Sequence, residues 1–128
     1  MDYFSSNSML LMEKSMNFLW TKQAAISDNI ANAETPGYKA KIVSFEDNLR
    51  AKLEQAMDSD RPRSNLRETL QNSEFAVISA QNSSRLDDNG VNVTEQMVEM
   101  VRNAYQLQYV MQAISTDLTT LRSAINGK

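Results

Sequence analysis

An acidic stretch, Asp87-Asp88-Asn89-Gly90, is the part of the sequence that comes nearest to a cation-binding loop. An EF-hand loop needs oxygen ligands at positions 1, 3 and 5, glycine at position 6 and glutamate at position 12. With Gly90 at position 6, position 1 is Arg85 and position 12 is Gln96. Because an arginine cannot be the first calcium ligand, we interpret the stretch as an Asn-Gly turn instead.

Other catalytic and metal chemistry is poorly supported. Histidine and cysteine are absent, which excludes disulfides, thiolate or imidazole metal ligands and every triad that uses histidine as its base. Carboxylate pairs such as Glu46-Asp47 lie in polar stretches without a neighbouring nucleophile. The chain has only three glycines, too few for a phosphate-binding loop. We therefore expect no enzyme activity, no metal and no cofactor.

Composition also restricts the partners. The net charge is −3 and the pI is near 4.9, and no run of Lys or Arg supplies the basic footprint that nucleic-acid binding needs. The first fifteen residues do not form a secretory signal, because Asp2 replaces a basic start and the longest apolar run is Met9–Met12. No stretch approaches the ~20 apolar residues of a membrane span. We expect one domain, no nucleic-acid partner, no direct membrane span and no cleavable signal peptide.

The N-terminal part of the chain carries a heptad pattern. Alternating steps of three and four residues connect Met9, Met12, Met16, Leu19, Gln23, Ile26, Ile30 and Ala33. Only Gln23 is polar, and this period is that of a coiled coil. The pattern predicts a helix from about Ser6 to Ala33, roughly 40 Å long at ~1.5 Å per residue.

The C-terminal part repeats the pattern without interruption. The same steps connect Met97, Met100, Ala104, Leu107, Met111, Ile114, Leu118, Leu121 and Ile125. Asn92, with Glu95 three residues later, is a predicted helix start, and Gly127 is a predicted stop. A second apolar flank includes Val98, Val101 and Tyr105. One face of this helix can pair with the N-terminal helix, parallel or antiparallel, and the other must meet a different molecule or stay exposed.

The middle of the chain has weaker patterns. A short helix is predicted after Ser44, a candidate cap, because apolar residues recur every four positions at Phe45, Leu49, Leu53 and Met57. Residues 58–69 are polar and charged around Pro62, which predicts a loop or mobile segment. Residues 74–79 form a brief β-like run. The turn at Asn89-Gly90, followed by Val91 and Val93, predicts a tight hairpin.

Together these patterns predict an all-α fold. Two long terminal heptad helices pack as a coiled-coil pair and are joined by a partly irregular middle with a short helix and a small β-like hairpin. We expect three parts: residues 1–38 (N-terminal helix and turn), 39–91 (a partly flexible middle segment) and 92–128 (C-terminal helix).

The end of the first helix is the most unusual local feature. Pro36 forbids continuation of the helix, and Pro36-Gly37 at the centre of Thr35-Pro36-Gly37-Tyr38 favours a type II turn. Asn29 and Asn32 lie on one face of the helix, where their amides are predicted to bind a neighbouring backbone or to cap the helix end.

Two stretches resemble a known family. NIANAETPGYKA, Asn29 to Ala40, resembles the N-terminal signature of the bacterial flagellar rod and hook proteins, the axial subunits of the basal body. Residues 86–125 resemble the C-terminal region of its shortest members, which form the proximal rod. A sibling proximal-rod type remains the alternative, although it typically has a proline just before the last helix and residues 91–95 have none.

This resemblance implies a structural subunit that self-assembles through both terminal helices into the tubular drive shaft that transmits motor torque. The implied partners are other copies, other rod proteins, the rod-to-membrane-ring adaptor, the basal-body ring and the export gate. The implied location is the periplasmic rod, after export by the flagellar type III system. The turn at residues 35–38 would lead the chain out of the tube wall. The rival hypothesis from another class is a free helical-bundle secretion chaperone or adaptor.

Overall fold

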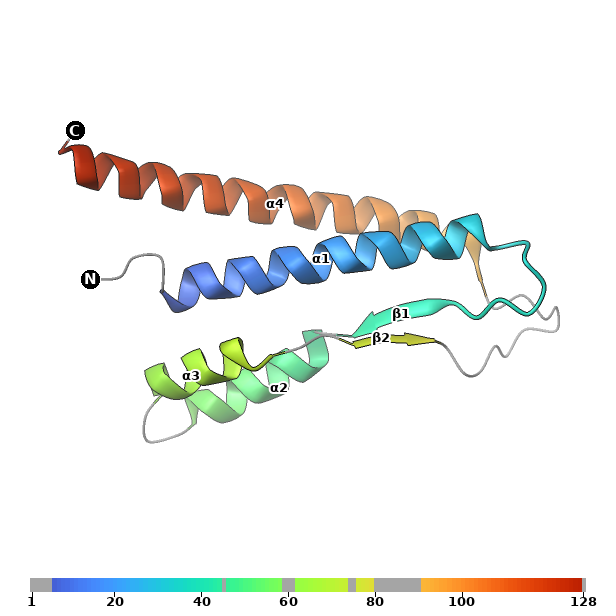
Figure 1. Ribbon diagram of the computed structural model, residues 1–128, viewed down its shortest axis with the longest axis horizontal. Coiled ribbons are helices and arrows are strands. Elements are labelled where there is room, and N and C mark those ends of the chain that lie inside the picture. Colours follow the sequence, from blue (N-terminus) through green and yellow to red (C-terminus); the bar gives the residue numbers. More distant parts are fainter. Residues whose placement is uncertain (1–5, 45, 59–61, 74–75, 80–90, 128) are drawn as a thin grey trace.

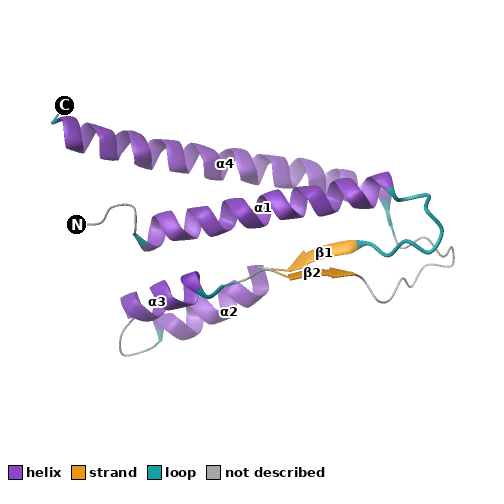
Figure 2. Cartoon of the chain, viewed as in Figure 1, coloured by secondary structure: helices purple, strands orange, loops and turns teal. Residues whose placement is uncertain are grey.

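Two long helices lie side by side along the molecule and run in opposite directions (Figure 1). The computed structural model describes residues 6–44, 46–58, 62–73, 76–79 and 91–127. In chain order the elements are α1 (Asn7–Ala31), β1 (Lys41–Ser44), α2 (Glu46–Met57), α3 (Pro62–Gln71), β2 (Ala76–Ser79) and α4 (Val93–Asn126). Helix predominates (Figure 2), so the predicted all-α fold with paired terminal helices is confirmed, and the pairing is antiparallel.

The long helices begin and end close to where the sequence predicts. The hydroxyl of Ser6 accepts a hydrogen bond from the Met9 amide at 3.1 Å, and Asn92 Oδ1 accepts one from the Glu95 amide at 3.3 Å. At the other end of α4, Gly127 has a left-handed φ of 64° and its amide bonds the Ser123 carbonyl. These caps satisfy backbone groups that a helix end otherwise leaves without partners.

The core lies where the α2–α3 pair meets the two long helices. Five buried residues of the described chain form one packed cluster there, with one or two from each helix: Phe18, Leu19, Leu49, Leu70 and Leu107. Leu10, Met16, Val43 and Val110 pack against this cluster and are partly buried. Burying a Leu or Phe side chain contributes about 1.5–3 kcal/mol. Among the described residues, Ala25, Ile26, Ala40 and Val91 are also buried, whereas much apolar surface on α4 stays exposed.

The two strands form a sheet that the sequence does not predict. β1 pairs antiparallel with β2, with Lys41 opposite Ser79 and Ser44 opposite Ala76. The β-like run at 74–79 is thus confirmed over Ala76–Ser79, but its partner is distant in sequence. The hairpin turn predicted at residues 86–90 lies outside the described residues. The strand expected after that turn is wrong, because Val93 is the first residue of α4 and Asn92 is its cap.

The loop predicted for residues 58–69 is wrong where it overlaps α3. Pro62 is the first residue of that helix, a position where its missing amide hydrogen is no loss. Leu66 and Leu70 lie four residues apart on one face, and Leu70 is buried in the core. The Lys14 ammonium of α1 also donates to the carbonyls of Gln71 and Ser73 at 3.3 and 3.2 Å, which caps the end of α3.

The short helix predicted for residues 44–57 is confirmed as α2. It begins at Glu46, because Ser44 is the last residue of β1 rather than part of the helix. Leu49 is buried in the core, whereas Met57 is exposed. Phe45 and the side chain of Leu53 lie outside the described residues.

Candidate assembly site

The predicted turn follows the end of α1. The Tyr38 amide donates to the Thr35 carbonyl at 3.2 Å, and Gly37 has a φ of 73°. A type II turn around Pro36-Gly37 needs this positive φ at its third position, so the prediction is confirmed. An added Cβ at Gly37 would meet no atom within 4 Å. Glycine is therefore required for its backbone conformation and not for space.

The side chain of Asn29 in α1 connects the turn to β1 and to the start of α4. Its side chain is 1% exposed. Nδ2 donates to the Lys41 carbonyl and to Gln96 Oε1, each at 2.9 Å. Oδ1 accepts from the Lys41 amide at 2.7 Å and from the Tyr38 hydroxyl at 3.2 Å. All four hydrogen-bonding positions of the amide are thus used, and the side chain binds Lys41 as an adjacent strand would.

Asn32 has a local role. Its Nδ2 donates to the Asp28 carbonyl at 2.9 Å, and its Oδ1 accepts from the Thr35 hydroxyl at 3.3 Å. The two asparagines therefore do what the sequence predicts: Asn29 binds a neighbouring backbone and Asn32 caps the helix. Beside them, Lys41 Nζ lies 2.7 Å from Asp28 Oδ2. That hydrogen bond and the charge of Asp28 raise the pKa of the Lys41 ammonium above its ordinary value.

A buried polar pair fixes the register of α1 against α4. Asn103 is 0% exposed, and its Nδ2 donates to the Leu19 carbonyl at 3.0 Å and to Gln23 Oε1 at 2.7 Å. Gln23, the polar interruption of the N-terminal seam, is thus a hydrogen-bond partner and not a defect. One turn away, Lys22 Nζ lies 3.4 Å from a carboxylate oxygen of Glu99. A single buried asparagine commonly specifies register in paired helices.

The predicted N-terminal seam largely faces the interior. Leu19 and Ile26 are buried, and Met12, Met16 and Ile30 are half-buried. The structure also buries Phe18 and Ala25, which lie off the seam on the side of α1 that faces the rest of the core. The seam therefore marks one of the two faces that α1 uses.

The predicted C-terminal seam is divided by the structure. Leu107 is buried, and Met100, Ile114 and Leu121 are half-buried. The other five seam residues are exposed: Met97, Ala104, Met111, Leu118 and Ile125. The positions that face α1 in their place are Gln96, Asn103 and Val110, one residue earlier in each heptad. α4 thus presents a more polar flank to α1 and keeps an apolar flank outside.

Sequence reasoning did not identify Gln96, Lys41 or Asn103 as partners in these contacts. The polar break at Gln23 was the available signal for Asn103, since a polar residue inside a heptad seam needs a polar partner when it is buried. Nothing local to Gln96 or Lys41 marks them as partners of Asn29, because they lie 67 and 12 residues away from it.

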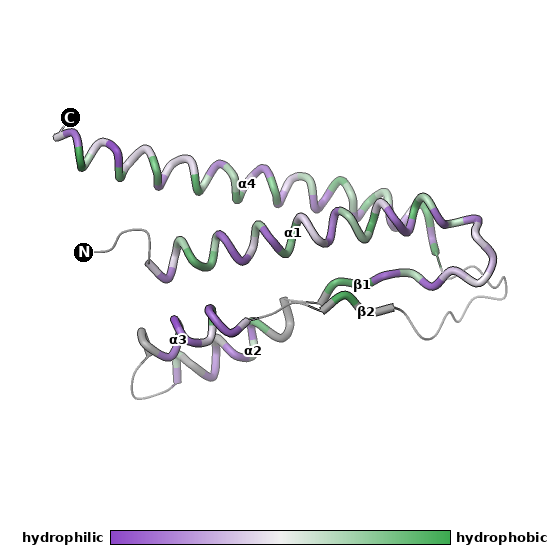
Figure 3. Tube along the Cα trace, in the orientation of Figure 1, coloured by the Kyte–Doolittle hydropathy of each residue, from purple (hydrophilic) through white to green (hydrophobic). Residues whose placement is uncertain are grey.

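The outer surface of α4 carries many exposed apolar side chains, most of them between Met97 and Met111. In addition to the exposed seam residues, Val98, Val101, Tyr105 and Tyr109 are 55–77% exposed. Figure 3 shows hydrophobic segments recurring to the end of α4, and Figure 1 shows that its C-terminal turns extend past the start of α1. Exposed apolar surface of this extent is typical of sites that bind other proteins. The arrangement is suited to helix packing.

The described part of the chain gives no sign of metal or membrane chemistry. Within it, no group of three or more acidic residues is placed to hold a metal ion. None of its helices is both long and apolar enough to cross a membrane.

The chain is similar to proteins of the bacterial flagellum. Residues 16–39, which include Asn29, Asn32 and the turn, match the family described as flagella basal body rod protein. The flagellar basal body rod protein FlgB of Bacillus subtilis strain 168 is 30% identical over 125 residues, covering 95% of each chain. FlgB of Aeromonas hydrophila is 27% identical over 106 residues, covering 80% of each chain. FlgB of Yersinia enterocolitica is 25% identical over 129 residues, covering 94% of this chain and 89% of that protein.

Proposed function

The chain belongs to the FlgB family of flagellar basal body rod proteins, and we propose that it is a structural subunit of the proximal rod that assembles through its two terminal helices. In this role it forms part of the tubular shaft that transmits motor torque. The proposal includes no catalytic activity. The sibling proximal-rod protein of the FlgC type is not favoured, because the relatives described above are all named FlgB.

The exposed apolar flank of α4 is the observation that carries the proposal. Met97, Met111 and Ile125 are 54%, 53% and 74% exposed and lie on one side of the helix. Interface cores are poor in charge and rich in Met and Tyr. Residues 103–121 contain only one charged residue, Asp117, although most of them are exposed. A solvated helix face normally carries charges, so this face is better suited to contact with other helices.

Each part of the chain then has a proposed task. Residues 1–38 and 92–128 are the rod helices with their turn, and residues 39–91 are the outer segment. The N-terminal seam pairs α1 with the rest of the chain, and the exposed residues of the C-terminal seam provide the contacts between subunits. The turn with Asn29, Asn32, Thr35, Pro36, Gly37 and Tyr38 directs the chain away from the helix layer. The lone chain has an exposed apolar flank on α4, which is expected to become buried when the chain docks.

Partners and location follow from the same proposal. The family places the chain in the flagellar basal body with other rod components. We propose contacts with further copies, with other rod proteins, with the rod-to-membrane-ring adaptor and with the basal-body ring and export gate. We further propose delivery to the periplasmic rod by the flagellar type III system.

Fractionation of flagellated cells tests the proposed function. A tagged chain that replaces the native copy should copurify with basal bodies and restore swimming to a deletion strain. The matched control is the same chain with Met111→Asp at an exposed position of α4, which should be made and fold but should not enter basal bodies. A functional tagged chain that stays out of basal bodies and instead holds an exported protein would support the chaperone hypothesis.

A further inference from the structure

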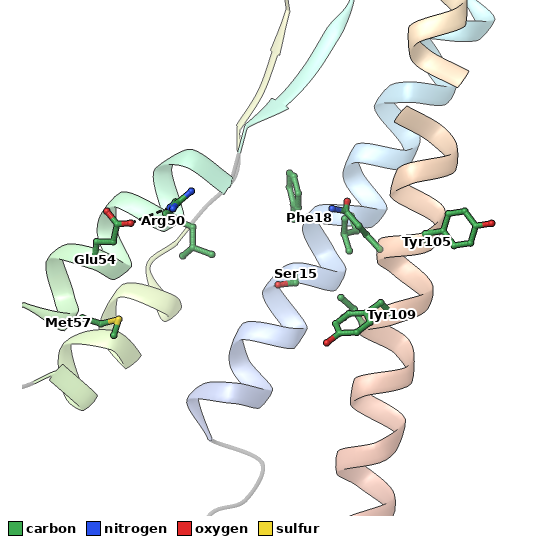
Figure 4. Close-up of a pocket in the computed structure, with 11 residues that line it drawn as sticks. Ser15, Phe18, Arg50, Glu54, Met57, Tyr105 and Tyr109 are labelled. Carbon is green, nitrogen blue, oxygen red and sulfur yellow. Dashed lines mark hydrogen bonds and ion pairs between the residues drawn. The ribbon is translucent and has the colours of Figure 1, made fainter. Parts of the chain in front are cut away.

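An open groove lies between α2 and the α1–α4 pair (Figure 4). Its volume is about 690 Å³. Phe18 and Leu19 of α1 form the floor, Leu49 and Met57 of α2 form one wall, and Tyr109 and Val110 of α4 form the other. Its walls are parts of three helices. Such a groove suits an amphipathic helix, which lays its apolar side chains into it.

The same chain carries exposed apolar side chains in the last turns of α4. Leu118 and Arg122 border a hollow that they line together with Met16 of α1, so α1 covers this part of α4 only in part. Because the helices are antiparallel, the last turns of α4 extend past the described start of α1 (Figure 1). Leu118 and Ile125 are 43% and 74% exposed, whereas Leu121 between them is half-buried. The segment from Leu118 to Ile125 is therefore an amphipathic helix end whose apolar side is partly open.

The groove wall and the helix end are similar in length. Leu49 and Met57, which line one wall, are separated by eight residues of helix, about 12 Å at ~1.5 Å per residue. Leu118 to Ile125 spans nearly the same length. The groove also contains Gln106 Oε1, which is buried and accepts no hydrogen bond from a described residue. In the helix end, the hydroxyl of Ser123 can donate to such an oxygen without bringing in a charge.

Their charges are complementary. In the wall of the groove, Arg50 and Glu54 form an ion pair at 3.2 Å, so neither is an unpaired charge. At the end of that wall, Asp58 is exposed, and the last turn of α2 has no basic residue to offset the negative end of the helix dipole. The segment Leu118–Ile125 contains one charged residue, Arg122, and no carboxylate side chain. Arg122 can therefore pair with Asp58 when the two surfaces meet.

We propose that Leu118–Ile125 of one copy occupies the groove between α2 and the α1–α4 pair of a second copy, with Arg122 beside the acidic end of α2. Groove and helix end are different surfaces of the chain, so the contact is heterologous and can repeat from subunit to subunit. Contacts of this type build open helical assemblies, as a rod subunit requires. The inference rests on the proposed function and names the partner surfaces of that assembly.

Cysteine cross-linking tests the contact directly, because the chain has no native cysteine. Met57→Cys and Ile125→Cys replace side chains that are 65% and 74% exposed, so both variants should fold. Cells that carry both single variants with tags of different size should give a mixed dimer in purified basal bodies after treatment with a short thiol cross-linker. Trp20→Cys is the matched control, since Trp20 is 57% exposed but does not line the groove. Its pairing with Ile125→Cys should give at most a tenth of that yield.

Absence of the Met57–Ile125 dimer from basal bodies that contain both variants would overturn the inference, and so would an equal yield with the Trp20 control. The proposed function would survive either result. If the wild-type tagged chain is missing from basal bodies, the proposed function itself fails. A charge exchange provides a second measurement: Arg122→Glu should lower the dimer yield about two- to fivefold, the range of an exposed ion pair, and Asp58→Arg should restore it. An unchanged yield in both variants would contradict the proposed orientation.

Discussion

Replacement of Asn29 by alanine tests the central contact of the turn. The side chain makes four hydrogen bonds, two of them to the amide and carbonyl of Lys41 and the others to Tyr38 and Gln96. Asn29→Ala removes all four and leaves the Lys41 backbone groups without their partner. Asn29→Asp keeps the shape and both acceptor contacts but loses the two donors, so it should not rescue the structure.

The expected loss follows from the number and burial of these bonds. Each contributes about 0.5–1.5 kcal/mol net. Tyr38 and Gln96 are half-buried and can bond water in the variant, so most of the loss comes from Lys41. We therefore expect a local destabilisation of about 2–4 kcal/mol in Asn29→Ala. Since each 1.4 kcal/mol is a factor of ten, the Lys41 amide should exchange with solvent at least about 30-fold faster.

Amide hydrogen exchange of the full chain, followed by NMR, measures this change at the amide concerned. Asn32→Ala is the control, because Asn32 is of the same type but less buried and donates one bond, to the Asp28 carbonyl. It should alter exchange at Lys41 by less than about fivefold, as expected for ~1 kcal/mol or less. The reasoning would be refuted if Asn29→Asp exchanged like the wild type, or if the Asn32 variant had the larger effect.

Three further predictions concern the turn, the core and one ion pair. Gly37→Val should lower the thermal midpoint and reduce the number of complete rods seen by electron microscopy, because a β-branched residue at a φ of 73° costs about 1–3 kcal/mol. Both effects should be smaller in Gly37→Asn, since asparagine adopts positive φ more readily. Leu107→Asp should abolish the helical circular dichroism of α1 and α4, since burying a carboxylate costs several kcal/mol, whereas Met111→Asp, at an exposed position, should leave it unchanged and block only assembly. Asp28 raises the pKa of the Lys41 ammonium above its ordinary value, so the stabilisation by this ion pair is present at neutral pH and is lost as the pH rises through the raised pKa. Measurement of the free energy of unfolding against pH should show this loss in the wild type and not in Asp28→Asn.

The sequence by itself determined the features whose causes lie within a few residues. Ser6 and Asn92 cap the starts of the long helices and Gly127 caps the end of α4, each through a contact three or four residues away. Pro36-Gly37 sets the turn through its own backbone preferences. The heptad spacing likewise predicted two long paired helices. Each of these signals can be evaluated without knowledge of the remaining fold.

The tertiary structure alone decided which neighbours each element meets. The pairing of β1 with β2 and the folding of residues 62–71 as α3 depend on partners distant in the sequence, namely a second strand, the core around Leu70 and the cap from Lys14. The rotation of α4 about its axis is the clearest case. Two heptad registers of α4 share Met100, Leu107, Ile114 and Leu121. One continues through Met97, Ala104 and Met111, and the other through Gln96, Asn103 and Val110. Hydrophobicity alone favours the first register. The structure uses the other, in which Asn103 Nδ2 donates to the Leu19 carbonyl and to Gln23 of α1, so both donors of this buried amide are used, although its Oδ1 accepts no hydrogen bond from a described residue. The more apolar flank is thereby left on the outside of the helix.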